Sequence, residues 1–461
     1  MVCGRYPWAV PVSDTAARLA GAGADLTDSP YAMLRLSVAL VLMTLGGCAM
    51  YCVVVVLPAV QAEFNVARGD ASLPYTLLMI GFGTGGVLMG RLADRFGVTV
   101  PLMIGACGIG AGFIAAAYAS SIWMFGIIHG VLLGLFGASA TFAPLIADTS
   151  LWFVKRRGIA VAVCASGNYL AGAVWPPIVQ GFVESAGWRT TYIGLGIFCG
   201  TLMFALAQLL RRRPPLAVAA MAAGTGGGSG NSNSNGSGGG ARLPAGTGAA
   251  AAAVASGHAS DRPFGLSPRA AQVLLCIAGT ACCVAMSMPQ VHIVAYCGDL
   301  GFGAARGAQM LSLMLGFGIV SRLISGAICD RIGGMRTLLL GSGLQGLALL
   351  LFLPFDSLVS LYVVSAMFGL FQGGIVPSYA IIVREYFAPA EAGARVGGVI
   401  MFTLLGMALG GWMSGAIFDL TGSYKAAFFN GIGWNLLNLS IVLWLWWRTR
   451  RPAGKTATQA A

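Results

Sequence analysis

Residues 90–97 read Gly-Arg-Leu-Ala-Asp-Arg-Phe-Gly, and residues 326–333 read Gly-Ala-Ile-Cys-Asp-Arg-Ile-Gly. Both octapeptides fit Gly-x-x-x-Asp-Arg-x-Gly, and they start 236 residues apart (326 − 90). Two further landmarks recur at an offset of 235: Gly134-Leu135-Phe136 as Gly369-Leu370-Phe371, and Glu184 with Gly187 as Asp419 with Gly422. Matches in the same order at a nearly constant spacing indicate an internal duplication.

The composition is that of a membrane protein. Of the 461 residues 57% are hydrophobic and only 9% are charged, and the mean hydropathy is +0.81, whereas soluble domains carry about 25% charged residues. A helix needs about 20 apolar residues to cross a bilayer. Segments of this kind predict twelve membrane helices at 34–60, 72–90, 98–119, 121–147, 158–181, 190–210, 270–297, 308–329, 337–354, 357–383, 395–418 and 424–447. The 119/121 and 354/357 junctions rest on short polar breaks, so each could instead be one bent segment.

A glycine-, serine- and asparagine-rich stretch at 214–260 separates six predicted helices from six. Such a composition is typical of a flexible linker. We therefore expect an all-α membrane protein with twelve transmembrane helices in two pseudo-symmetric six-helix bundles. Its parts are an N-terminal tail (1–33), a first bundle (34–210), a linker (211–269), a second bundle (270–447) and a basic C-terminal tail (448–461).

The distribution of basic residues predicts the orientation. If the N-terminus is cytoplasmic, 22 of the 27 basic residues fall in cytoplasmic segments, Arg322 lies within a helix, and four lie outside: Arg68, Arg189, Arg306 and Lys425. This is the positive-inside bias. It predicts a multi-pass protein of the plasma or inner cell membrane with both termini cytoplasmic. The net charge of +12 then requires no nucleic-acid partner.

The repeated octapeptide is placed in the loops after the second and eighth helices, and it resembles the cytoplasmic signature of the major facilitator superfamily. The resemblance covers nearly the whole chain and implies two bundles that rock around a central site. The expected gating residues are Gly90, Asp94, Arg95, Gly326, Asp330 and Arg331. The glycines would let helices approach closely, and the charged residues would pair or cap a neighbouring helix in one conformation. The alternative interpretation is a tight turn with solvated charges.

A second resemblance lies around the predicted fifth helix, in Trp152-Phe153-Val154-Lys155-Arg156-Arg157-Gly158-Ile159-Ala160, Ala165–Gly172 and Trp175-Pro176-Pro177. These stretches resemble those of monocarboxylate transporters and of oxalate/formate exchangers. The resemblance implies that Arg322 stands where that branch carries its substrate-binding arginine. The chain departs from the branch at Gly318, where an aspartate is often found, and it has no lysine in the first or eleventh helix.

Arg322 is unusual without any family. It lies eight residues before Asp330, or about 12 Å from the inner boundary at 1.5 Å per residue. An arginine at that depth is a functional-site hypothesis by default, and its planar fork suits a carboxylate. No acidic residue lies in the predicted middle of any helix, which favours an external anion as its partner. The alternative is a structural arginine bonded to backbone carbonyls or reaching toward the interface.

Further substrate-binding candidates are the polar residues His292, Tyr51, Asn168 and Gln372. A histidine can carry a proton near neutral pH, so a proton is a candidate coupling ion. All four residues could equally be packing residues or interhelical hydrogen-bonding groups.

Other functions find no support in the sequence. The eleven cysteines lie mostly in apolar segments, without metal or disulfide spacing, and the first 33 residues show no signal peptide. Residues 81–86 match Gly-x-Gly-x-x-Gly but lie inside a predicted membrane helix, where close helix packing explains them better than dinucleotide binding. With no phosphate-binding loop, catalytic set or metal motif, we expect neither an enzyme nor a cofactor.

We therefore expect a monomeric secondary active transporter of small organic anions, in particular monocarboxylates such as lactate, that works by alternating access as a symporter or antiporter. A drug or metabolite exporter of the same fold is the nearest alternative, although the Gly-Pro signature typical of such exporters is missing from the fifth helix. A non-transporting membrane sensor is the other.

Overall fold

The computed structural model describes residues 26–153, 155–212 and 263–450. Most of the predicted tails and linker (1–25, 213–262 and 451–461) lie outside the described residues. The rest folds into twelve helices long and apolar enough to span a membrane, which confirms the predicted fold class. The first six spans are α2 (Pro30–Phe64), α3 with α4 (Arg68–Ala71, Leu73–Phe96), α5 (Thr99–Ala117), α6, η1 and α7 (Ile122–Ile128, His129–Ala138, Ser139–Trp152), α8 (Arg157–Ala186) and α9 (Trp188–Leu209). After the short turn η2 (Pro263–Gly265), the next six are α12 (Pro268–Asp299), α13 (Ala304–Ile332), α14 (Gly334–Leu351), α15 with α16 (Leu358–Gln372, Ile375–Tyr386), α17 (Pro389–Thr421) and α18 (Tyr424–Arg450).

Several helices begin at serines that cap them. The side chains of Ser29, Ser121, Ser267 and Ser357 each accept a hydrogen bond from the backbone N–H three residues later, which satisfies a donor that the first helical turn leaves free. Ser121 and Ser357 start α6 and α15 after the two short polar breaks. At both junctions the chain therefore forms two separate helices, and a single bent segment is excluded.

The repeated octapeptide lies within helices, so its predicted location in loops is wrong. Gly90, Asp94 and Arg95 belong to the last two turns of α4, and Gly326, Asp330 and Arg331 to those of α13. Both helices end at the residue just before the motif's final glycine, which caps them as Gly97 (φ +84°) and Gly333 (φ +83°). This left-handed region is open to glycine at little cost, so the final glycine of the motif stops the helix and the preceding residues continue it.

The two halves repeat each other in their packing as well as in sequence. Gly134 of η1 lies against the carbonyl oxygen of Leu78, where an added Cβ would come within 2.6 Å, and Gly369 of α15 lies against that of Met314 in the same way. Leu78 and Met314 are 236 residues apart, the offset of the repeated motif. In each half the fourth helix thus packs against the second helix at an equivalent glycine, Gly134 in the first half and Gly369 in the second. Gly81 also contacts Gly130 across this pair of helices, as expected for close packing.

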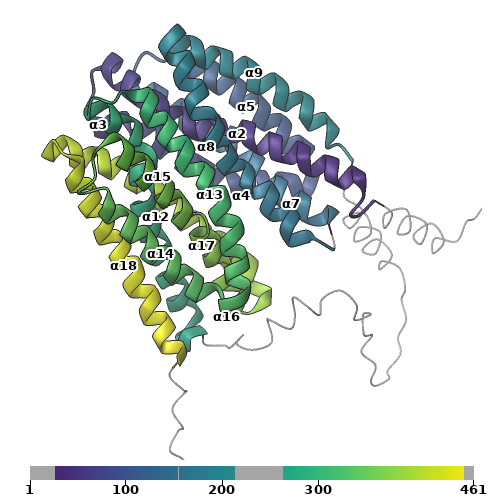
Figure 1. Cartoon of the computed structure of the whole chain (residues 1–461). Coiled ribbons are helices and arrows are strands. Elements are labelled where there is room, and N and C mark those ends of the chain that lie inside the picture. The colour runs from purple at the N-terminus through teal and green to yellow at the C-terminus, as the bar shows by residue number, and fades with distance from the viewer. Residues whose placement is uncertain (1–25, 154, 213–262, 451–461) are drawn as a thin grey trace, which may run out of the picture.

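The halves lie side by side, the first coloured purple to teal and the second green to yellow in Figure 1. They meet along α8 with α13 and along α4 with α17. In both contacts the fifth helix of one half packs against the second helix of the other half, as a pseudo-two-fold arrangement requires. The central helices α2 and α12 are the most buried of the spans.

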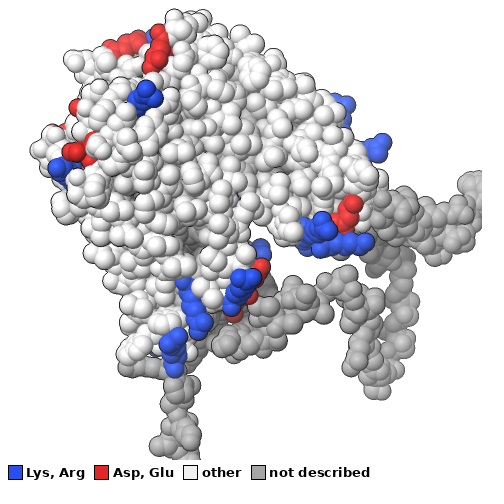
Figure 2. All heavy atoms as spheres, in the orientation of Figure 1, with Lys and Arg blue, Asp and Glu red and all other residues white. Residues whose placement is uncertain are grey.

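Charged side chains gather at the two ends of the bundle, with an uncharged belt between them (Figure 2). Here the terminal end is the one at which α2 begins (Pro30) and α18 ends (Arg450), and the far end is the one that carries Arg68 and Tyr424. Large apolar side chains such as Phe429 and Val359 are exposed on the outside, as expected of a surface covered by lipid.

Candidate functional site

Arg322 bridges the two halves without a carboxylate partner. It lies in α13, half-buried, and its Nη1 donates to the backbone oxygen of Ala165 in α8 at 3.0 Å. Its Nε makes a long contact of 3.5 Å to the carbonyl oxygen of Gly373, and the guanidinium lies 4.6 Å from the centre of the Tyr169 ring. None of the ion pairs within residues 26–153, 155–212 and 263–450 involves Arg322. The hydrogen-bond acceptors of the guanidinium among the described residues are therefore uncharged carbonyl oxygens.

The missing aspartate at Gly318 has a packing reason. A Cβ at Gly318 would come within 2.5 Å of Cδ1 and Cε1 of Tyr169. The aromatic ring thus occupies the space that an acidic side chain would need, one helical turn from Arg322. This chain therefore has an aromatic surface beneath the arginine, one helical turn away.

A second tyrosine lies close to this point. Tyr51 of α2 packs against Gly172 of α8, where an added Cβ would lie 2.8 Å from Tyr51 Cζ. Tyr51 and Tyr169 are both buried. The Tyr51 hydroxyl makes no hydrogen bond with another described residue. Phenol groups beside an arginine without an acid form a set of donors that suits an anion.

Tyr51 is among the site residues predicted from the sequence, and Tyr169 is not. Tyr169 lies in the quoted stretch Ala165–Gly172, next to Asn168. The signal that could have identified it is a tyrosine in a membrane helix at a position facing the partner half.

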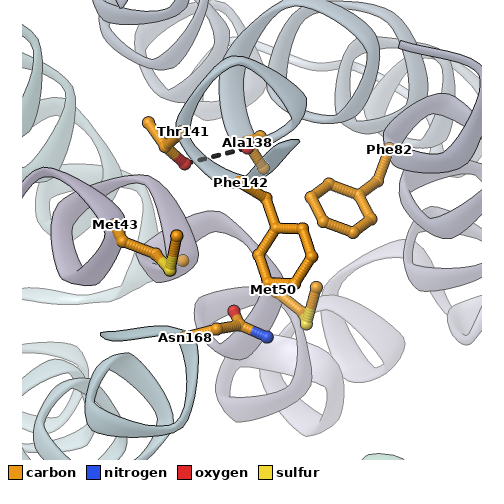
Figure 3. Close-up of a pocket in the computed structure, with 8 residues that line it drawn as sticks. Met43, Met50, Phe82, Ala138, Thr141, Phe142 and Asn168 are labelled. Atoms are coloured by element: carbon orange, nitrogen blue, oxygen red, sulfur yellow. Dashed lines mark hydrogen bonds between the residues drawn. The ribbon is translucent and has the colours of Figure 1, made fainter. Parts of the chain in front are cut away.

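Asn168 lines a narrow cavity inside the first half, beside the interface (Figure 3). The gap among its lining side chains is too small to admit a water molecule. The wall consists of Met43, Gly47, Met50, Phe82, Ala138, Thr141, Phe142 and Asn168. Thr141 donates to the carbonyl oxygen of Ala138 at 2.8 Å, so the amide of Asn168 is the main polar group left to face this apolar space.

Gln372 lies next to the arginine's carbonyl contact in the chain but is already engaged. Its Oε1 accepts a hydrogen bond from Nε2 of Gln290 at 2.9 Å, while its own Nε2 is buried without a partner among the described residues. The following residue, Gly373, provides one of the carbonyl contacts of Arg322. Gln372 is thus near the arginine, with one donor free.

His292 is not brought to Arg322. It is fully buried near the far end, where its ring nitrogens contact the Tyr424 hydroxyl at 3.1 Å and the Gly411 carbonyl oxygen at 2.8 Å. Its predicted role as a substrate-binding residue beside the arginine therefore finds no support in this arrangement. The helical register of α12 turns it toward α17 and α18 instead.

The far end is held shut by polar contacts between the halves. Nη1 and Nη2 of Arg68 donate to the Asp299 carboxylate at 3.0 and 3.1 Å, and Nη1 also donates to the Tyr424 hydroxyl at 2.7 Å. The Asp419 carboxylate accepts from the backbone N–H groups of Arg68 and Gly69 at 2.8 and 2.7 Å. Arg68 belongs to the first half and its partners to the second. We call Arg68, His292, Asp299, Asp419 and Tyr424 the far-end latch.

The terminal end is open. The hydrogen bonds between the described parts of α8 and α13 run from Ser312, which donates to the Ala173 carbonyl oxygen, to Arg322. One turn further, a Cβ at Gly326 would meet nothing within 4 Å. Helices α4 and α17 likewise touch at Gly83, where an added Cβ would lie 2.9 Å from Met401 Sδ. At Gly90 of α4 an added Cβ would meet nothing within 4 Å. Figure 2 shows the surface indented between the halves at this end, with basic side chains on both rims.

The predicted gating residues consequently lie apart in this conformation. Asp94, Arg95, Asp330 and Arg331 form no ion pair with another described residue. The close helix approach expected at Gly90 and Gly326 is not present, because the halves are separated at the end where both glycines lie.

Two pseudo-symmetric six-helix bundles, closed at one end and open at the other around a half-buried arginine, define a polytopic membrane carrier. The sequence profile described as Major Facilitator Superfamily matches residues 39–360 and 298–461, and the chain belongs to that superfamily of transporters. Monocarboxylate transporter 12 of Xenopus laevis is 25% identical over 376 residues, covering 77% of this chain and 75% of that protein. Monocarboxylate transporter 13 of Rattus norvegicus is 25% identical over 339 residues, covering 73% and 71%.

Among solved structures, that of a point mutant of the nucleoside transporter NupG aligns with a TM-score of 0.63 at 12% identity, covering 88% of this chain and 99% of that one. At this identity the likeness concerns the fold alone. The resemblance to the major facilitator superfamily and to monocarboxylate transporters is confirmed.

Proposed function

We propose that this transporter carries a small organic anion of the monocarboxylate class by alternating access, with Arg322 as the carboxylate clamp. The observation that supports this most is the guanidinium itself, which is half-buried between the halves and, within the described residues, hydrogen-bonded to carbonyl oxygens and to no carboxylate. Leaving a buried charge without a counter-ion is costly. A carboxylate that arrives with the substrate removes that cost and forms two charge-assisted hydrogen bonds.

The position of Arg322 links binding to the movement of the halves. It belongs to α13 but donates to Ala165 of α8, and Tyr51 and Tyr169 come from the other half. A carboxylate held by Arg322 on one side and by a tyrosine hydroxyl on the other would tie the halves together through the substrate. Such an interaction favours the occluded state through which alternating access must pass.

The basic residues support a direction for the open end. Most basic residues within the described ranges lie at the terminal end, and positively charged segments remain in the cytoplasm. With both termini cytoplasmic in a cell membrane, the conformation described above faces inward. Arg322 then lies at the apex of the inward-facing opening, where a cytoplasmic anion reaches it directly.

Counterflow of radiolabelled lactate into proteoliposomes tests the proposal. The variant Arg322→Gln keeps a polar side chain that can donate to a carbonyl but removes the charge, and we expect at least a hundredfold loss of uptake, the equivalent of about 3 kcal/mol. The matched control is Arg306→Gln at an exposed arginine of the same helix, hydrogen-bonded only to Gln309, which should transport normally. Undiminished uptake by folded Arg322→Gln would contradict the clamp. Stabilisation by lactate without counterflow would indicate a sensor instead of a carrier.

A further inference from the structure

The hydrogen bonds of His292 determine its protonation state in the closed far-end latch. Nε2 lies 2.8 Å from the backbone oxygen of Gly411, and a carbonyl oxygen can only accept, so Nε2 carries the hydrogen. In a neutral imidazole the other nitrogen is then an acceptor. Nδ1 therefore accepts from the Tyr424 hydroxyl, 3.1 Å away.

This assignment makes the latch a one-way chain of donors across the two halves. Arg68 of the first half donates to the Tyr424 oxygen at 2.7 Å. Tyr424 donates to His292, and His292 donates to Gly411. The phenol can accept from Arg68 and still give its own hydrogen only because Nδ1 of His292 is free to receive it. The closed latch thus requires a neutral His292.

The charged groups around His292 offer no hydrogen-bond acceptor for the N–H that a second proton on the ring would create. Arg68 of α3 is a cation on the other side of Tyr424. The two carboxylates are engaged elsewhere: Asp299 of α12 binds the Arg68 guanidinium, and Asp419 of α17 binds two backbone N–H groups at the start of α3. The remaining titratable neighbours on α12 and α4 are the phenols of Tyr296 and Tyr75, the first packed on the Tyr424 ring and the second beside Gly411.

We propose that His292 is the proton-binding site of the far-end latch and that a proton bound there opens it. A proton on Nδ1 turns the acceptor into a donor, so the Tyr424 hydroxyl faces an N–H and its own hydrogen loses its acceptor. It also places a second cation beside Arg68. Opening removes both conflicts, since it separates Arg68 from Tyr424 and gives water access to the imidazole.

By linkage, the same coupling makes the open latch bind the proton more tightly than the closed one. The far side of the membrane supplies the proton when the latch opens and takes it back before the latch closes. Acid on that side would therefore favour the conformation that faces it. Naming this end the outer gate rests on the proposed transport function.

Hydrogen–deuterium exchange of the full chain in lipid nanodiscs tests the proposal without any substrate. The segments to follow are residues 64–72 and 411–424, which meet at the latch. After correction for the intrinsic pH dependence of exchange, both segments should exchange about tenfold faster at pH 5.5 than at pH 7.5, the change that one buried hydrogen bond produces in an opening equilibrium. In the variant His292→Gln, whose amide can donate to Gly411 and accept from Tyr424 but cannot be protonated, this acceleration should disappear.

The chain contains a matched control. His129 is also fully buried and bonded to a backbone oxygen, that of Phe125, and to a tyrosine hydroxyl, that of Tyr192, but all three residues belong to the first half. The variant His129→Gln should keep the acid response of the latch segments. Tyr424→Phe removes the hydroxyl that needs Nδ1 as an acceptor, so its latch should be looser at pH 7.5 and respond less to acid than the wild type, since only the repulsion between His292 and Arg68 remains.

Equal acceleration in wild type and His292→Gln would overturn the proposal, as would a wild type whose latch segments do not respond to acid. If His292→Gln does not fold, the Tyr424→Phe comparison decides in its place, and an unchanged acid response in that variant overturns the proposal. The exchange measurement needs no transport. A negative exchange result with successful lactate counterflow therefore contradicts the role of His292 alone, and the opposite pair of results contradicts the proposed transport function alone.

Discussion

Replacing Gly318 with alanine perturbs the aromatic surface on which the Arg322 guanidinium rests. The new Cβ would lie 2.5 Å from two carbon atoms of the Tyr169 ring, whereas carbon atoms in contact are normally about 3.5–4.0 Å apart. The ring must therefore move by about 1 Å or more. Overpacking of this kind costs about 1–3 kcal/mol, and moving the ring also weakens its interaction with the guanidinium 4.6 Å away, worth about 0.5–2 kcal/mol.

We expect Gly318→Ala to lower lactate counterflow by about tenfold or more and to reduce thermal stability. Gly316→Ala is the control on the same helix, because its Cβ would meet only Ala173 at a distance of 3.9 Å, and it should transport normally and be slightly more stable through its higher helix propensity. The double variant Gly318→Ala/Tyr169→Ala tests the cause. With the ring gone, the alanine at 318 should cost nothing further, so the two effects are not additive. Equal behaviour of the Gly316 and Gly318 variants would refute the argument that this glycine is required by the ring.

Three further predictions concern the latch, the tyrosines and the terminal end. Asp299→Asn leaves Arg68 with a weaker acceptor, so hydrogen exchange in residues 64–72 should rise several-fold even at neutral pH. The effect is moderated because the Asp299 side chain is 35% exposed. The control Glu391→Gln weakens an ion pair whose carboxylate is 60% exposed, and it should leave exchange in residues 64–72 unchanged. Tyr51→Phe should raise the KM for lactate without changing the melting temperature, since the Tyr51 hydroxyl has no described partner to lose, whereas Tyr379→Phe should cost about 1 kcal/mol of stability because the Tyr379 hydroxyl donates to Asn438 at 2.7 Å. Gly90→Leu should fold normally, as a side chain there meets open space in this conformation, but should slow transport by blocking closure of the terminal end; wild-type rates would show that α4 does not approach another helix at that glycine.

The twelve helices could be predicted because a helix that crosses the bilayer needs an apolar run as long as the hydrocarbon core is thick. Their ends could not, because caps decide them: α2 runs from Pro30 to Phe64, between the Ser29 cap and Asn65 in the left-handed region (φ 50°), instead of the predicted 34–60. The same reason explains why the repeated motif was placed in loops. Hydropathy falls at its charged residues several positions before the glycine that stops each helix.

The site was only partly predictable. Arg322 stood out because a charge deep in a membrane helix is rare, and no other chain segment is needed to recognise it. Its surroundings come from α2 and α8, and a single sequence does not show which faces of these helices meet. For that reason Tyr169 is absent from the predicted site, and His292 is grouped with the arginine although its helix directs it to the far-end latch.

The central claim is that Arg322 binds the substrate through the substrate's negative charge and not through its shape alone. The most direct measurement compares the thermal stabilisation of purified wild-type protein by lactate and by lactamide, which has nearly the same shape but no charge. We predict stabilisation by lactate, little or none by lactamide, and loss of the difference in Arg322→Gln. Equal stabilisation by the acid and its amide in the wild type would contradict the account.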